Sequence, residues 1–95
     1  MPWPLTHHSA TIQDMARVSA KQDQDHYLSR LGAAVRARRT ALALSQEALA
    51  DSAEIDRSHM GKIERGERNV TFLNIVRIAK AVQCKPSDLL VDADL

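Results

Sequence analysis

Residues 44–66 have the sequence LSQEALADSAEIDRSHMGKIERG and predict two short helices joined by a tight turn. Ser45 is suited to begin the first helix, because its hydroxyl can accept a hydrogen bond from a backbone N–H group of the first turn. Asp56 is placed to begin the second helix in the same way. We therefore expect helices at about 45–52 and 56–65.

The second of these helices separates apolar from polar side chains. Met60 and Ile63 recur at helical spacing and are expected to face inward. Arg57, Ser58 and Lys62 then face outward. When a helix lies in a DNA groove, Arg and Lys match the paired acceptors of guanine and Ser can serve either base type. Any one of these side chains is equally compatible with an ordinary solvated helix face, so the joint pattern carries the inference.

These residues resemble the lambda-repressor-like helix-turn-helix family of phage and bacterial regulators, also called the Cro or XRE type. The family's Ser-Gln-Glu-x-Leu-Ala element is matched by residues 45–50, and its Ile-Glu-Arg-Gly-Glu element by residues 63–67. The likeness continues over residues 28–91. It implies an all-α, five-helix DNA-binding domain with the helix-turn-helix at the second and third helices. It does not specify which DNA is bound.

Helical periodicity places the other three helices. They are expected at about 26–42, 71–83 and 86–91. The helix at 71–83 has one apolar face, made of Phe72, Ile75, Ile78, Ala79 and Val82. Residues 1–24 precede the family match and form an N-terminal arm, flexible or a short helix, while residues 25–95 form the DNA-binding domain.

The resemblance also implies roles for individual residues. Arg57, Ser58 and Lys62 fall where the family contacts bases. Gln46 falls where the family contacts a phosphate and supports the recognition helix. Further phosphate or auxiliary contacts are expected from His59, Asn69 and Thr71.

A pair of charges is expected behind the recognition helix. Arg39 and Glu64 occupy positions at which the family often forms a structural ion pair. The alternative is two unrelated surface charges, which would contribute only ~0 to 1 kcal/mol.

The sequence departs from the family pattern at three turns, where Ala43, Glu54 and Gln83 stand in place of the usual glycine. These are positions at which the chain often takes a positive φ. A residue other than glycine in that left-handed region costs on the order of 1 kcal/mol. We expect either a cost to stability or turns of slightly different geometry.

Basic charge is local rather than global. The net charge is only +1, and 95 residues suffice for one domain with a small core. Six basic side chains nevertheless lie between residues 57 and 80, against two acidic ones: Arg57, Lys62, Arg65, Arg68, Arg77 and Lys80 against Glu64 and Glu67. Such clustering is typical of a DNA-binding surface.

Several other classes of protein are disfavoured. The four histidines match no metal-ligand spacing, and no glycine-rich run or acid–base pair suggests catalysis, so we expect no metal, cofactor or enzymatic activity. One cysteine, Cys84, cannot form an internal disulfide and falls at an apolar family position. No apolar run approaches the ~20 residues of a membrane span, and the N-terminus lacks a signal-peptide layout. A cytoplasmic, nucleoid-associated protein is expected.

The sequence thus favours a transcriptional regulator that binds a palindromic operator in double-stranded DNA as a homodimer. Autoregulation, as in restriction-modification controllers or phage repressors, fits this class. Apolar residues crowd the C-terminal end and are expected to form the dimer interface: Leu89, Leu90, Val91 and Leu95. The alternative is an antitoxin-like or adaptor protein whose arm binds a partner protein through Trp3, Ile12, Met15 and Val18.

Overall fold

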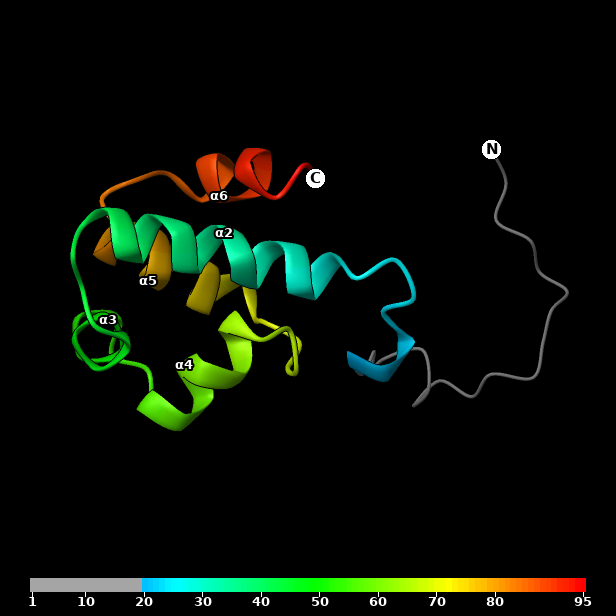
Figure 1. Ribbon diagram of the computed structural model, residues 1–95, viewed down its shortest axis with the longest axis horizontal. Coiled ribbons are helices and arrows are strands. Elements are labelled where there is room, and N and C mark those ends of the chain that lie inside the picture. Colours follow the sequence, from blue (N-terminus) through cyan, green and yellow to red (C-terminus); the bar gives the residue numbers. More distant parts are fainter. Residues whose placement is uncertain (1–19) are drawn as a thin grey trace, which may run out of the picture.

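The computed structural model describes residues 20–95, and every regular element in that range is helical (Figure 1). A short 3₁₀ helix, η1, precedes five α-helices. Their bounds are η1 Ala20–Gln22, α2 Tyr27–Ala41, α3 Gln46–Ala53, α4 Arg57–Glu64, α5 Phe72–Ala81 and α6 Pro86–Asp92. The predicted all-α, five-helix fold is therefore confirmed. No helix in this range is long and apolar enough to cross a membrane.

Side-chain caps define where four of the helices begin. Ser45 Oγ accepts a 3.0 Å hydrogen bond from the Ala48 amide, and Asp56 accepts one of 3.3 Å from the His59 amide. Thr71 Oγ1 accepts a 3.2 Å hydrogen bond from the Asn74 amide. Thr71 is therefore the cap, and α5 starts one residue later than predicted. The sequence did not indicate the cap of α2, in which the Asp23 carboxylate accepts hydrogen bonds from the amides of Tyr27 and Leu28.

Each of the five α-helices is followed, one or two residues after its end, by a residue with positive φ. These residues are Ala43 (56°), Glu54 (57°), Gly66 (72°), Gln83 (62°) and Asp94 (60°). Each is flanked by the same pair of backbone hydrogen bonds, which satisfy carbonyl groups of the last helical turn. The three positions where the sequence lacks the family's glycine are thus left-handed, as the family geometry implies, and each costs on the order of 1 kcal/mol.

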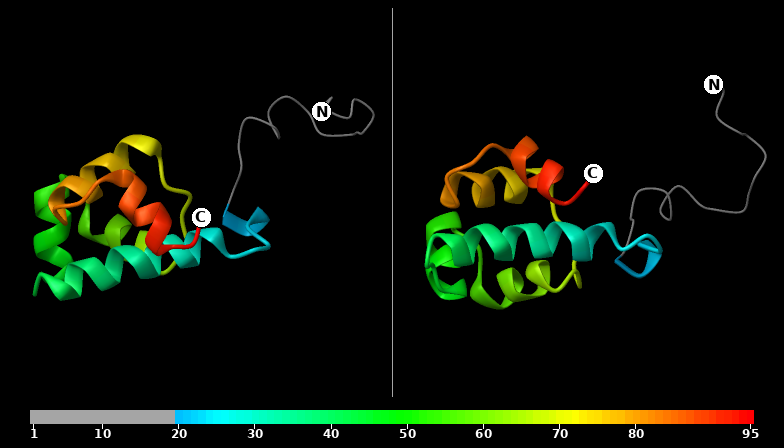
Figure 2. Two further views of the ribbon diagram at one scale, coloured as in Figure 1. Left: turned by 90° about the horizontal axis from the view of Figure 1, so that it is seen from above. Right: turned by 45° about the horizontal axis from the view of Figure 1, so that its top comes forward.

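α2 is the central element. It runs the length of the domain with α4 on one side and α6 on the other, while α3 and α5 close the remaining side (Figures 1 and 2). The core between the helices is aliphatic. Its largest fully buried side chains are Val35, Leu49, Met60, Ile63, Ile78 and Leu89.

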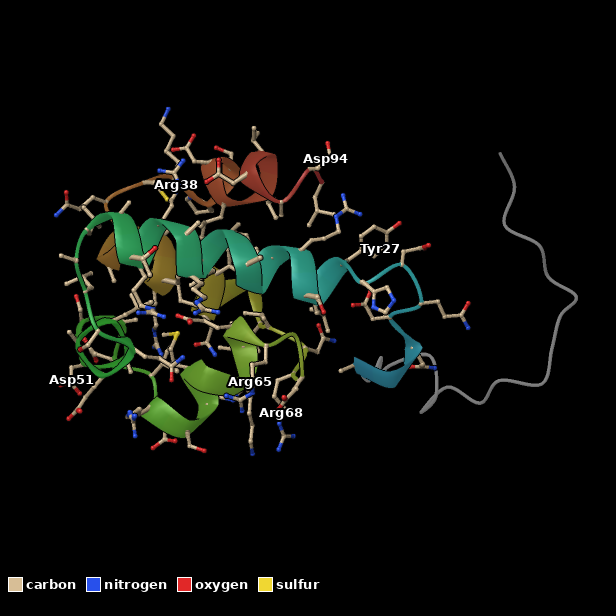
Figure 3. The ribbon with its side chains drawn as sticks, in the orientation of Figure 1. Tyr27, Arg38, Asp51, Arg65, Arg68 and Asp94 are labelled. Carbon is tan, nitrogen blue, oxygen red and sulfur yellow. The ribbon has the colours of Figure 1, made fainter. Side chains whose placement is uncertain are left out.

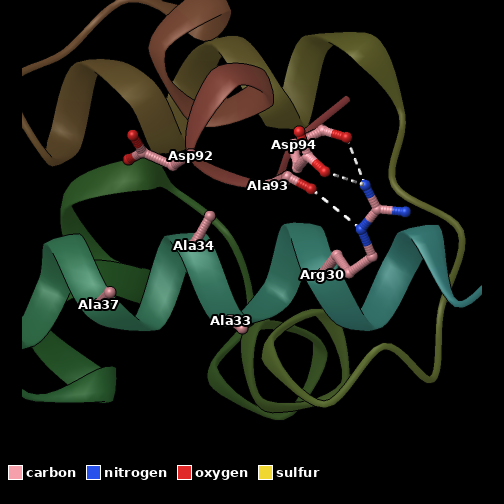
Figure 4. Close-up of a pocket in the computed structure, with 7 residues that line it drawn as sticks. All are labelled: Arg30, Ala33, Ala34, Ala37, Asp92, Ala93 and Asp94. Carbon is pink, nitrogen blue, oxygen red and sulfur yellow. Dashed lines mark hydrogen bonds and ion pairs between the residues drawn. The ribbon is translucent and has the colours of Figure 1, made fainter.

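Two arginines of α2 hold the end of α6. Arg30 Nε donates a 3.0 Å hydrogen bond to the Ala93 carbonyl, and its Nη2 donates to the Asp94 carbonyl (Figure 4). About two turns farther along α2, Arg38 Nε lies 2.6 Å from Asp92 Oδ2. Carbonyl groups at the end of a helix have no hydrogen-bond donor within the helix, and Arg30 supplies donors to those after α6. These contacts fix α6 on the face of α2 opposite α4.

Candidate nucleic-acid interface

α4 presents its polar side chains to solvent and its apolar side chains to the core. Arg57 and Ser58 are exposed at its N-terminal end, whereas Lys62 and His59 are half-buried. Met60 and Ile63 are almost completely buried. The outward face predicted for this helix is therefore the face that the structure leaves accessible.

An open polar hollow lies between the start of α3 and the outer face of α4. It is lined by Gln46, Arg57, Ser58, Gly61 and Arg65. Gly61 keeps it open, because a Cβ atom there would lie 3.1 Å from both Gln46 Oε1 and Arg65 Nη1. The hollow gathers three of the residues expected to contact DNA and adds Arg65. Lys62 and His59 do not line it.

Gln46 supports α4 from its neighbouring helix. Its Nε2 donates a 3.1 Å hydrogen bond to Glu64 Oε1, so one end of the side-chain amide is committed within the protein. Its Oε1 faces the hollow beside Gly61. Part of the predicted role, the support of the recognition helix, is thus visible in the geometry.

Arg39 and Glu64 form a two-pronged ion pair between α2 and α4. Arg39 Nε lies 2.7 Å from Glu64 Oε2, and Arg39 Nη2 lies 2.9 Å from Glu64 Oε1. Their side chains are only 12% and 4% exposed. The hydrogen bonds that Arg39 donates to Glu64 raise the pKa of the Arg39 guanidinium against the opposing effect of burial. The alternative of two unrelated surface charges is therefore excluded.

The connection between α4 and α5 extends the polar face. Arg65 and Arg68 project from the side of the molecule that carries α4, away from α2 (Figure 3). Arg65 Nε lies 2.8 Å from Glu67 Oε2, and this hydrogen-bonded contact raises the pKa of Arg65 and lowers that of Glu67. Asn69 and Thr71 are both exposed in this segment.

Two sequence expectations about apolar side chains need correction. Leu89 is 0% exposed and packs in the core, so its side chain is not available to a partner. Phe72 was placed on the inward face of its helix but is 71% exposed, because it is the first residue of α5 and extends beyond the core. Leu90, Val91 and Leu95 are exposed as expected, and the neighbouring Leu73 is exposed as well.

Other chemistry finds little support in the described part of the chain. Within residues 20–95 no group of three or more histidine, cysteine or acidic side chains is arranged to hold a metal ion. Burial raises the pKa of the half-buried Cys84 thiol, which disfavours the reactive thiolate. Trp3, Ile12, Met15 and Val18, on which the adaptor alternative depends, lie outside the described residues.

Comparison with known proteins gives this geometry a context. A model of the helix-turn-helix family matches residues 35–89. Control protein C.BamHI from Bacillus amyloliquefaciens is 47% identical over 47 residues, covering 50% of this chain and 58% of that protein. Control protein C.SmaI from Serratia marcescens is 41% identical over 56 residues, covering 59% of this chain and 67% of that protein. The matched region is thus less than two thirds of C.BamHI.

The likeness extends to three dimensions. The crystal structure of the restriction-modification controller protein C.AhdI from Aeromonas hydrophila matches with a TM-score of 0.64 and 45% identity, covering 65% of this chain and 94% of that chain. The match covers nearly all of that chain, so C.AhdI and this chain share the helical arrangement described above.

Proposed function

Since the chain belongs to the lambda-repressor-like helix-turn-helix family of DNA-binding transcription regulators, we propose that it binds a palindromic operator as a homodimer and controls transcription from it. The observation that supports this most strongly is the polar hollow on α4. In this hollow, Arg57 and Ser58 lie beside Gln46. Both stand at the exposed end of α4, a helix whose opposite face is buried in the core. This arrangement supplies base-contacting donors next to a phosphate-contacting one.

The proposal divides the residues into two groups. Arg57, Ser58 and Lys62 contact base edges in the major groove. Gln46, His59, Asn69 and Thr71 contact the sugar-phosphate backbone or assist, and so set affinity and register. Arg57 is expected to discriminate most, because a guanidinium can donate two hydrogen bonds to one guanine.

The similar proteins suggest a biological setting. Two of them are named control proteins and one is named a restriction-modification controller. We infer that this chain regulates genes of a restriction-modification system, its own gene among them.

An exposed apolar edge supports the dimer. We define the apolar edge as the exposed side chains at the start of α5 and the end of α6: Phe72, Leu73, Leu90, Val91 and Leu95. α5 and α6 are joined by a short turn and pack against each other (Figure 2). Monomeric proteins rarely leave such apolar surface uncovered. A two-fold contact here would place two α4 helices ~34 Å apart, in successive major grooves.

Selection of bound sites from random duplex DNA, followed by competition titration, tests DNA recognition. Arg57→Ala should weaken binding to the selected site by ~1 to 3 kcal/mol and weaken binding to random DNA far less. Arg36→Ala, which removes an exposed arginine of α2, serves as the control and should leave the ratio of the two affinities unchanged. Equal losses on both DNAs for Arg57→Ala would contradict the assignment.

Sedimentation of the full chain tests the dimer separately. Val91→Asp places a charge in the apolar edge, where Val91 is 72% exposed, and should shift the chain toward monomer without unfolding it. Leu42→Asp makes the same kind of change at an exposed position at the end of α2 and should leave the association unchanged. A wild-type chain that is monomeric at tens of micromolar, and that binds a palindromic site one to one, would exclude the dimer.

A further inference from the structure

α4 and α2 touch through their backbones, at a glycine in the middle of α2. Gly32 is buried, and a Cβ atom built on it would lie 2.4 Å from the Glu64 carbonyl oxygen and 2.5 Å from that of Ile63. Real Cβ atoms do not approach backbone oxygens this closely. The last turn of α4 therefore occupies the space that any other residue at position 32 would need.

A second contact lies one helical turn earlier on the same face of α2. Gly66, in the turn after α4, has a φ of 72°, and its Cβ would lie 2.5 Å from Ser29 Oγ and 2.7 Å from Ser29 Cα. Ser29 and Gly32 are three residues apart, so both lie along one side of the helix. The ion pair of Arg39 with Glu64 adds a third contact farther along α2.

All three contacts hold the same end of α4. They involve its last two residues and the turn that follows, whereas Arg57 and Ser58 lie at the other end of this eight-residue helix. At 1.5 Å per residue the two ends are ~10 Å apart. A small change of tilt at the held end is therefore carried to the DNA-contacting end, where recognition requires placement within ~0.5 Å.

We propose that Gly32 is a positioning residue for DNA recognition: its missing side chain sets the depth and tilt at which α4 rests on α2. The inference rests on the proposed function, because it concerns how that function becomes selective. Gly32 does not contact DNA and acts only through the placement of α4.

The substitution Gly32→Ala tests this, because the direction of its effect on stability separates two explanations. Inside a helix, alanine is normally more favourable than glycine, so helix propensity alone would make the variant more stable. Displacement of α4 instead predicts a lower melting temperature and, in the folded variant, poorer discrimination between DNAs.

The experiment is a competition titration of the full chain, at a temperature where circular dichroism shows each variant folded. The probes are a duplex carrying the selected site and a random-sequence duplex. Gly32→Ala should lose ~10-fold or more in affinity for the selected site and change less than ~3-fold on random DNA. Ala33→Ser, at the neighbouring exposed position, is the control and should behave as wild type.

A second variant covers the case in which Gly32→Ala does not fold. Arg39→Lys keeps the positive charge but cannot form the two-pronged contact with Glu64, so it loosens the same end of α4 without a clash. It should lower the affinity ratio in the same direction by a smaller factor. An unfolded Gly32→Ala together with a wild-type ratio in Arg39→Lys would overturn the inference.

The remaining outcomes separate the two proposals. If the wild-type chain discriminates and folded Gly32→Ala keeps the wild-type affinity ratio, Gly32 is merely structural and the inference is overturned alone. If the wild-type chain does not discriminate between any selected duplex and random DNA, the proposed function fails and the inference with it.

Discussion

The turn after α3 and the turn after α4 share one backbone geometry but differ in the residue at its left-handed position. Glu54 has a φ of 57° and Gly66 a φ of 72°. Each turn is closed by a 2.9 Å hydrogen bond spanning five residues, from Ile55 to Ala50 in one and from Glu67 to Lys62 in the other. Glu54 is exposed, whereas a side chain on Gly66 would meet Ser29. The difference shows that glycine is required here by lack of space rather than by φ alone.

The other helix ends agree with this explanation. α2, α5 and α6 are followed by Ala43, Gln83 and Asp94, which have left-handed backbone conformations and are all exposed. Each costs on the order of 1 kcal/mol relative to a relaxed conformation, which a folded domain tolerates. Gly32 and Gly66 differ from these residues. A Cβ atom on Gly32 would meet backbone atoms of α4, and a Cβ atom on Gly66 would meet backbone atoms of Ser29 in α2.

The largest expected effect breaks the junction of α2 with α4. Arg39→Ala or Glu64→Ala leaves the partner as an unpaired, mostly buried charge and should lower the free energy of unfolding by ~3 to 5 kcal/mol. Urea denaturation of the two single variants and the double variant measures this. The double variant should be more stable than the sum of single losses implies. Melting temperatures equal to wild type in both single variants would contradict a buried pair.

The next effect compares the two turns directly. Gly66→Ala combines left-handed strain with overlap against Ser29 and should destabilise the domain by ~2 to 4 kcal/mol. Glu54→Ala changes an equally left-handed but exposed residue and should stay within ~0.5 kcal/mol of wild type. Similar losses in both variants, again from urea denaturation, would mean that φ rather than space distinguishes the turns.

The turn after α5 offers a smaller effect on stability, in the stabilising direction. Gln83→Gly relieves a positive φ where nothing crowds the backbone, and should stabilise by up to ~1 kcal/mol. Ala81→Gly, two residues earlier within α5, should instead destabilise by about that amount or more, because it lowers helix propensity and removes a methyl group that packs against the core. Calorimetry on the pair checks the sign, and two changes of the same sign would refute the strain at Gln83.

The smallest effect concerns the exposed ion pair of Arg65 with Glu67, which spans Gly66. The Glu67 pKa is lowered in the folded state, chiefly by the hydrogen bond from Arg65. A lowered folded pKa means that stabilisation by this pair is present at neutral pH and is lost as the pH falls through that value. The melting temperatures of wild type and Glu67→Gln should therefore differ slightly at pH ~7 and converge near pH ~3. A difference that grows on acidification would contradict the pair.

Local signals allowed much of this structure to be anticipated. Ser45 and Asp56 each stand directly before the helix that they cap, so the starts of α3 and α4 followed from the sequence. The family positions of Arg39 and Glu64 likewise indicated their contact, because a fold shared with the family fixes which side chains meet.

What the sequence did not indicate depends on which neighbour covers a surface. Helical spacing assigned Phe72 to an inward face, and the crowding of apolar residues at the C-terminal end assigned Leu89 to a dimer interface. Only the packed structure shows that Leu89 is covered and Phe72 is not. The sequence indicated no role for Gly32, because the need for glycine there comes from the distance to α4. Arg65 was not among the residues expected to contact DNA, and its place with Gln46 in one hollow depends on how α3 meets α4.

Our main proposal is that α4 contacts DNA with its free end while its other end stays fixed on α2. The most direct test is a titration of the ¹⁵N-labelled full chain with the selected duplex, followed by NMR. We expect large chemical-shift changes for the backbone amides of Arg57, Ser58 and Gln46. The amides of Gly32 and Ile63 should keep nearly the same chemical shifts. Large shifts confined to α5 and α6, with α4 unaffected, would contradict it.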